Sequence, residues 1–214
     1  MKIYGFPLSP FVRKTLVALH EKGLEFELVP TNPQQPTDDF AACSPFSKIP
    51  AMEDDGFKLA DSTAIIAYLD AKHVERPLLP ADPQARGRAV WFEEVADTVL
   101  VPAGVGMVVN RFLRPRIFGT EGDEEAAKAS EEAIKKPLGY LEQAVSDGRW
   151  LDAEFSVGDI AIASTIKTLS YAGWNIDQAT NPRLAAWYER MEARPAWQKA
   201  AGQEQAIFAG AGLS

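Results

Sequence analysis

The sequence of 214 residues contains one cysteine, Cys43, and only two histidines, His20 and His73. A single cysteine excludes an internal disulfide and any Cys-x-x-Cys redox or zinc motif. So few sulfur and imidazole ligands also argue against a metal-dependent enzyme, and we expect no metal. Cys43 is therefore interpreted as a small buried residue.

Long apolar runs and large basic clusters are missing as well. No stretch of about 18 apolar residues occurs, and the first residues carry no apolar run of signal-peptide length. We therefore expect a soluble, cytoplasmic protein that does not bind a membrane. The net charge is −8, and the arginines of segment 111–116 are the only basic concentration, so nucleic acid is not expected as a partner. Those arginines form either a solvated helix end or a landing site for an anionic group.

Hydrophobic residues make up 46% of the chain and charged residues 24%, which is typical of globular proteins. The alternating residues 2–6 and 25–30 read as strands, and a helix over 10–22 lies between them. Ser9 is the expected N-cap of this helix, and Gly23 ends it. Strand, helix and strand predict a crossover unit with a parallel strand pair.

Three prolines between residues 77 and 83 break the pattern and predict an interdomain connector. Everything beyond it reads as helical. We expect a long helix over 84–114, kinked by Pro102 and weakened by Gly104 and Gly106, and then a charged helix over 123–145 that is bent near residues 137–139.

Segment 155–160 predicts the start of a buried helix. Ser156 is the N-cap and Asp159 stands at N3, so the two form a capping box, while Phe155 and Ile160 supply a hydrophobic staple. The following residues are too apolar for a surface helix, and we expect them at the centre of the second domain.

Residues 44–69 combine a proline-rich loop, a hairpin and a helix. Asp55-Gly56 predicts a tight turn between short strands at 51–53 and 57–60. A helix over 63–72 follows, with Asp61 or Ser62 as its N-cap. Its N-terminus points back to the loop before Pro50 and offers free N–H groups and a partial positive charge, which suit a carboxylate. A hairpin and helix held by ordinary caps is the alternative interpretation.

The segment Ser44-Pro-Phe-Ser-Lys-Ile-Pro-Ala51, followed by Asp61-Ser-Thr-Ala-Ile65, resembles the glutathione-binding half of the cytosolic glutathione S-transferases. That family carries Asn-Pro-x-Gly-x-(Val/Ile)-Pro-x-Leu and Glu-Ser-x-Ala-Ile. Segments 155–166 and 181–195 are similar to its buried helix and its C-terminal helix.

The resemblance implies an α/β plus all-α fold. A thioredoxin-like domain with a four-stranded mixed sheet and helices would cover residues 1–76, a linker 77–85, and an all-helical domain 86–214. It also implies a cis peptide bond between Ile49 and Pro50.

Ser9-Pro-Phe-Val-Arg13 is similar to the Ser-x-x-x-Arg arrangement of serine-type members, and the chain looks like a bacterial, theta- or phi-like one. The resemblance implies that Ser9 donates to the sulfur of glutathione and stabilises the nucleophilic thiolate. A role as helix cap alone is the alternative, and the two roles are compatible. Tyr4 lies too early for a tyrosine-type member.

By the same resemblance, glutathione is the co-substrate. The main chain of Ile49, next to Pro50, would pair with the cysteinyl unit, and Lys48 would face the glycyl carboxylate. Asp61 and Ser62 would hold the γ-glutamyl end.

The chain departs from the family pattern at three positions. Asp61 replaces Glu, Ser44 replaces Asn, and Gln35 stands where phi-like members carry His or Lys. These departures concern affinity for glutathione more than the fold.

A pocket for a small hydrophobic electrophile is expected between the domains, because such clefts favour ligand binding. Its predicted walls are Phe11, Met107, Val108 and Phe112. The alternative is that these are plain core residues.

The resemblance also implies a two-fold homodimer in which Phe46 inserts between helices of the partner. Asp97 would then lie near the neighbouring glutathione. Alternatively, Phe46 folds back over Phe40 of its own domain.

Three classes of function follow from these observations. The first is a transferase that conjugates glutathione to electrophiles, with detoxification as its role. The second is a non-catalytic module of the same fold that binds ligands or proteins. The third is a dithiol oxidoreductase. It is excluded because the start of the first helix has Ser9 and lacks a cysteine pair.

Overall fold

The computed structural model describes residues 1–145, 149–152, 154–210 and 212. The chain forms two compact units, one made of Met1–Leu79 with Arg194–Ser214 and the other of Pro80–Ala193. The last helix thus belongs with the first part of the chain. The sequence-based division at residues 76 and 86 groups this segment with the helical domain and stays a prediction.

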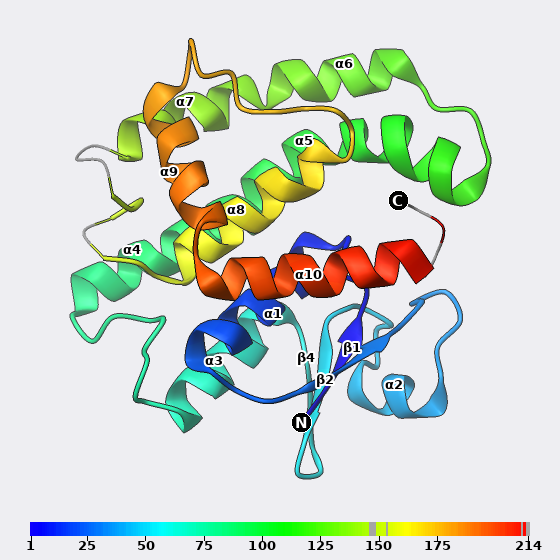
Figure 1. Cartoon of the computed structure of the whole chain (residues 1–214), viewed down its shortest axis with the longest axis vertical. Coiled ribbons are helices and arrows are strands. Elements are labelled where there is room, and N and C mark those ends of the chain that lie inside the picture. Colours follow the sequence, from blue (N-terminus) through cyan, green and yellow to red (C-terminus); the bar gives the residue numbers. More distant parts are fainter. Residues whose placement is uncertain (146–148, 153, 211, 213–214) are drawn as a thin grey trace. The chain divides into compact units, whose positions relative to one another are not determined.

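The first unit contains a four-stranded mixed sheet among its described residues (Figure 1). Its elements are β1 (Lys2–Gly5), α1 (Pro10–Lys22), β2 (Glu27–Pro30), α2 (Asp38–Cys43), β3 (Ala51–Asp54), β4 (Phe57–Ala60), α3 (Ser62–Lys72) and α10 (Pro195–Gly210). The strand order is β2-β1-β3-β4. β1 pairs in parallel with β2, as the crossover unit requires, and the other two pairings are antiparallel.

The turn between β3 and β4 has the geometry that its sequence predicts. Asp55 and Gly56 both adopt positive φ, 49° and 84° respectively. Two consecutive residues of this kind match the right-handed twist of the flanking strands in a two-residue hairpin. The carboxylate of Asp54 then accepts a hydrogen bond from Tyr68 Oη (2.8 Å) and forms an ion pair with Lys72, which ties the hairpin to α3. The Lys72 ammonium lowers the pKa of Asp54, and the Tyr68 hydroxyl contributes to the same shift.

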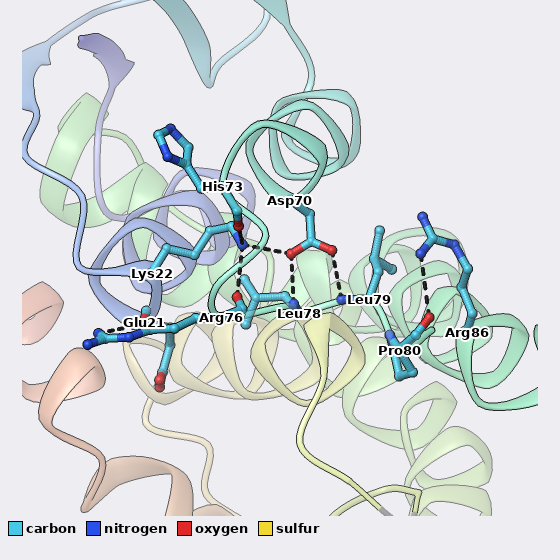
Figure 2. A network of polar contacts seen from close by, with 9 residues as sticks. All are labelled: Glu21, Lys22, Asp70, His73, Arg76, Leu78, Leu79, Pro80 and Arg86. Atoms are coloured by element: carbon cyan, nitrogen blue, oxygen red, sulfur yellow. Dashed lines mark hydrogen bonds and ion pairs between the residues drawn. The ribbon is translucent and has the colours of Figure 1, made fainter. Parts of the chain in front are cut away.

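A buried lysine fixes the end of α3 and the segment that follows it (Figure 2). Lys22 Nζ donates to Asp70 Oδ1 and to the carbonyls of His73 and Arg76, each at 2.8 Å. The carboxylate of Asp70 also accepts from the backbone N–H groups of Leu78 (2.7 Å) and Leu79 (3.2 Å). Three acceptors match the three donors of an ammonium group, which is what a buried charge needs.

Helix α10 lies along α1 and is bound to it through side chains at several points. Arg13 forms a buried ion pair with Glu204, and His20 Nε2 lies 2.9 Å from Gln203 Oε1. At the far end, the ring of Phe208 stacks on Phe6 with 6.0 Å between the ring centroids. The sequence predicted helical structure here but not the bounds of α10 or its packing on α1.

The second unit is helical throughout its described residues. Its elements are α4 (Pro83–Glu94), η1 (Val95–Leu100), α5 (Val101–Val108), η2 (Val109–Phe118), α6 (Glu124–Ala133), α7 (Lys135–Ala144), α8 (Val157–Ser170) and α9 (Pro182–Glu192). The first four follow one another without a break, and η1 and η2 are π-helices. Pro102 is the second residue of α5, shortly after η1 ends, and Pro115 lies inside η2. Proline has no N–H and its ring collides with the carbonyl four residues earlier, so the wider π spacing accommodates both residues.

The glycines of α5 are packing residues. A Cβ atom on Gly104 would lie 2.6 Å from Leu169 Cδ2, and one on Gly106 would lie 2.1 Å from Ser130 Oγ. Both positions therefore let α5 approach its neighbouring helices closely. The sequence had suggested only that these residues weaken the helix.

The capping box at the start of α8 is present. Ser156 N–H donates to Asp159 Oδ2 (3.0 Å), and Ser156 Oγ accepts from Gly158 N–H (3.2 Å). Asp159 Oδ1 also accepts from Leu151 N–H (3.0 Å) and from Trp187 Nε1 (2.8 Å), and the carboxylate is fully buried. One buried acid thus joins α8, α9 and the segment before α8.

No described helix is both long and apolar enough to cross a membrane. A search of the described residues for three or more His, Cys, Asp or Glu side chains in a metal-binding group finds none.

Candidate functional site

The turn between β1 and α1 carries Ser9. Its N–H donates to the carbonyl of Phe6 (3.0 Å), and its own carbonyl accepts from Arg13 N–H (3.0 Å). Ser9 is the N-cap residue, as predicted, with φ −67° and ψ 127°, but its side chain makes no capping hydrogen bond. The half-buried hydroxyl therefore stands at the positive end of a helix without being used to close it.

Arg13, the other member of the Ser-x-x-x-Arg arrangement, faces α10. Its Nε lies 2.9 Å from Glu204 Oε2, and both side chains are buried. The guanidinium therefore ties α10 to the helix that begins at Ser9.

The loop before β3 is held by a serine. Ser44 Oγ accepts from Lys48 N–H (2.9 Å) and donates to the carbonyl of Lys48 (2.7 Å). Ser44 stands where the family pattern has Asn, and because it is buried this reciprocal pair braces the loop. The Ile49–Pro50 peptide bond is cis, as the resemblance implied.

Asp61 is the N-cap of α3. Its Oδ1 accepts from Thr63 N–H (2.9 Å) and Ala64 N–H (3.1 Å). The backbone adopts φ 81°, an unusual value for a residue with a side chain, and the N–H donates to the carbonyl of Pro50 (3.2 Å). The start of α3 is thereby hydrogen-bonded to the cis-proline. Strain of this kind is concentrated at ligand-binding positions.

Of the remaining predicted binding residues, Ser62 is buried at the first position of α3. Lys48 and Gln35 are exposed, and Gln35 N–H closes a turn onto the carbonyl of Asn32 (3.0 Å). Ile49 is half-buried and packs against the apolar cluster around Tyr4. All of these residues belong to the first unit.

The predicted electrophile-pocket residues lie on different elements. Phe11 is half-buried on α1, whereas Met107 and Val108 are buried on α5. Phe112 lies on η2 and packs against Tyr171, with 5.4 Å between the ring centroids. Their assembly into one pocket stays a prediction.

The two predicted dimer residues differ in exposure. Phe46 exposes 83% of its surface, whereas Phe40 is fully buried against Tyr4. The alternative in which Phe46 folds over Phe40 does not fit this exposure. Asp97 is half-buried on η1, and its placement near a partner's site stays a prediction.

Lys14 was not predicted from the sequence as a site residue. This lysine is 1% exposed, and its Nζ lies 3.3 Å from Thr63 Oγ1 in the first turn of α3. The sequence held one indication of its burial, the uninterrupted apolar run of residues 16–19. Such a run is typical of a helix that is buried on more than one face, so that a charged residue on the adjacent turn is buried as well.

Two family models match the chain. The glutathione S-transferase N-terminal domain matches residues 3–77, and the C-terminal domain of the same family matches residues 124–190. A curated relative from Zea mays, glutathione S-transferase 3, is 34% identical over 207 residues, which cover 93% of this chain and 92% of the relative. The chain belongs to the glutathione S-transferase family.

Other comparisons with glutathione S-transferases agree. The enzyme of that name from Hyoscyamus muticus is 31% identical over 212 residues, which cover 96% of this chain and 99% of the relative. The crystal structure of a glutathione S-transferase from Rhodospirillum rubrum F11 superposes with a TM-score of 0.86 at 26% identity, covering 93% of this chain and 90% of that one. The predictions of family, fold class and enzyme class are thereby confirmed.

Proposed function

We propose that this glutathione S-transferase conjugates glutathione to small hydrophobic electrophiles, with the thiolate stabilised by Ser9. The observation that carries the proposal is the Ser9 hydroxyl, which stands at the start of α1 and makes no capping hydrogen bond. A capping bond would use the hydroxyl only as an acceptor, and without that bond the hydroxyl is also free to rotate and donate to an anion.

The chemistry requires a thiolate at neutral pH. A free thiol has a pKa of about 8.5 and is mostly protonated there. Lowering the pKa of the glutathione thiol to about 6.5 needs roughly 2.7 kcal/mol of differential stabilisation. A hydroxyl donor together with the positive end of a helix is sufficient for this, because hydrogen bonds to an ionised group are the strong ones.

The peptide would be held by the cis-proline loop and by α3. The main chain of Ile49 pairs with the cysteinyl unit like an added strand, and Lys48 attracts the glycyl carboxylate. At the other end, Asp61 uses one carboxylate oxygen to cap α3, so Oδ2 takes the α-ammonium group. Ser62 and the helix start take the α-carboxylate. Gln35 would complete the glycyl end.

The second substrate would contact Phe11, Met107, Val108 and Phe112, whose side chains are apolar and suit a hydrophobic electrophile. These four residues are supported by their apolar character and by the preference of ligands for apolar clefts. Detoxification of such compounds is the proposed role, and glutathione is a co-substrate that is consumed.

The proposal also includes a two-fold homodimer in which the ring of Phe46 enters the partner. An apolar ring that is 83% exposed on a polar loop supports this assignment, because burial of the ring in a partner removes that surface from water.

The pH dependence of conjugation with a generic aryl halide tests the role of Ser9. We expect the wild type to show an inflection below the pKa of free glutathione, and Ser9→Ala to lose it. At neutral pH the variant should be about 100- to 1000-fold slower, because one donor to a developing charge is removed. Glutathione affinity should barely change.

Ser156→Ala provides a matched control, because it deletes the hydroxyl of a serine N-cap that does make a capping hydrogen bond. We expect this variant to lose about 1 kcal/mol of stability, whereas Ser9→Ala should lose almost none. An unchanged rate and pH profile in Ser9→Ala would remove Ser9 from catalysis. Retention of the wild type on immobilised glutathione without turnover would favour a non-catalytic binding module.

A further inference from the structure

Lys14 is a buried charge in the first unit that the proposed catalytic cycle does not use. It lies on the second turn of α1, is 1% exposed, and is among the largest fully buried side chains. Burying an ammonium group costs free energy unless it is hydrogen-bonded. The polar groups that contact the ammonium group therefore show where its charge acts.

The ammonium group lies beside the first turn of α3. Lys14 Nζ donates to Thr63 Oγ1 at 3.3 Å, and Thr63 is the second residue of that helix. The N–H of the same Thr63 is bonded to Asp61 Oδ1 at 2.9 Å. Lys14 and Asp61 thus both contact Thr63: the ammonium group contacts the Thr63 side chain, and the carboxylate accepts from the Thr63 main chain.

The sign of this charge matters. The start of a helix already carries a partial positive charge and favours anions, so a cation placed there raises the positive potential further. The exposed carboxylate of Asp61 supplies a negative charge next to it. An adjacent positive and negative region is complementary to a zwitterion, and an α-amino acid group is a zwitterion.

We propose that Lys14 is a positioning residue that strengthens binding of the α-carboxylate at the γ-glutamyl end of glutathione. It acts through Thr63 and the first turn of α3 and does not touch the peptide. Asp61 serves the α-ammonium group of the same end. The inference rests on the proposed function, because it assigns a further residue to the proposed glutathione site.

Isothermal titration with two peptides tests the proposal. One is glutathione, and the other is 4-aminobutyryl-cysteinylglycine, which lacks the α-carboxylate and keeps the amino group. In Lys14→Met we expect the Kd for glutathione to rise about tenfold, which corresponds to about 1.4 kcal/mol, and the Kd for the second peptide to stay unchanged. The methionine keeps the length of the side chain and removes its charge.

Lys22→Met is the matched control. It also removes a buried ammonium group from α1, but one that contacts Asp70 and not the start of α3. We expect it to lower stability without changing the ratio of the two Kd values. Equal weakening of both peptides by Lys14→Met, or no weakening of either, would overturn the proposal in favour of a purely structural role.

Thr63→Val covers the case in which Lys14→Met does not fold. It keeps the lysine and removes the hydroxyl that the ammonium contacts. The same selective loss for glutathione would support the proposal, and equal weakening of both peptides would overturn it. A wild type that binds neither peptide would overturn the proposed function itself, whereas a wild type that binds glutathione without this selectivity in the variants would overturn only the role of Lys14.

Discussion

The carboxylate of Glu204 lies against the guanidinium of Arg13, with 2.9 Å between Oε2 and Nε, although the two residues are 191 positions apart. Their side chains are only 6% and 4% exposed. Removing only one partner of such a pair strongly destabilises the fold, because the remaining charge stays buried without its partner.

We therefore expect Glu204→Ala to lower the free energy of unfolding by about 3 kcal/mol. Urea denaturation followed by circular dichroism measures this change. Glu132→Ala is the control, since its pair with Lys135 is exposed and should contribute about 0–1 kcal/mol. The double variant Arg13→Met, Glu204→Met should recover part of the loss. A drop in Glu204→Ala no larger than in the control would contradict the prediction.

Asp61 combines a structural and a binding role, and two substitutions separate them. Asp61→Asn keeps a side-chain oxygen for Thr63 N–H and Ala64 N–H, so we expect stability close to wild type. Removal of the charge should still weaken glutathione binding by about 1.5 kcal/mol, because the α-ammonium loses its ionic partner. Asp61→Ala should lose the affinity and also about 1 kcal/mol of helix capping. Wild-type affinity in Asp61→Asn would show that the acid serves only the helix.

Ser47 is a further departure from the family pattern, since it stands where that pattern has glycine, and it adopts φ 51°. In this left-handed backbone region the Cβ atom of a residue lies too close to its own backbone. Glycine has no Cβ and avoids this steric strain. We expect Ser47→Gly to raise the free energy of unfolding by about 0.5–1 kcal/mol without changing glutathione affinity. Ser47→Ala keeps the strained Cβ and should give no gain. Equal stability of the two variants would show that the strain is negligible.

Phe46 supplies the prediction about assembly. In a two-fold dimer the same contact occurs twice, so truncation of this ring acts at both ends of the interface. We expect Phe46→Ala to weaken the dimer by about 3 kcal/mol for each ring, as seen in sedimentation equilibrium. Val74→Ala is a suitable control, since Val74 is also exposed but lies outside the loop. A monomeric wild type, or a variant dimer of the same strength, would refute the contact.

Local signals predicted much of the fold. Pro10 and Gly23 gave the bounds of α1, because proline suits the first helical position and Gly23 adopts the left-handed conformation after the last. Asp55-Gly56 gave the hairpin, and the Ser156–Asp159 box gave the start of α8. Each of these features depends on residues that are neighbours in the sequence.

What the sequence did not predict depends on residues far apart in the chain. Lys14 and Arg13 look like ordinary surface charges of a helix until α3 and α10 are placed beside them. Gly104 and Gly106 look like helix breakers until Leu169 and Ser130 are seen at the distances that exclude a Cβ. The sequence left the N-cap of α3 open between Asp61 and Ser62. It also gave no indication that the side chain of Ser9 makes no capping hydrogen bond.

Because α10 belongs to the first unit, the two parts of that unit are synthesised at different times. A ribosome delivers the chain from the N-terminus, and domains usually fold as they emerge. Here the sheet and α1 leave the ribosome before the second unit, but the Glu204 carboxylate that pairs with Arg13 follows that unit. The first unit is therefore completed only after the whole second unit has been synthesised, and a nascent chain stopped before residue 194 lacks this helix on α1.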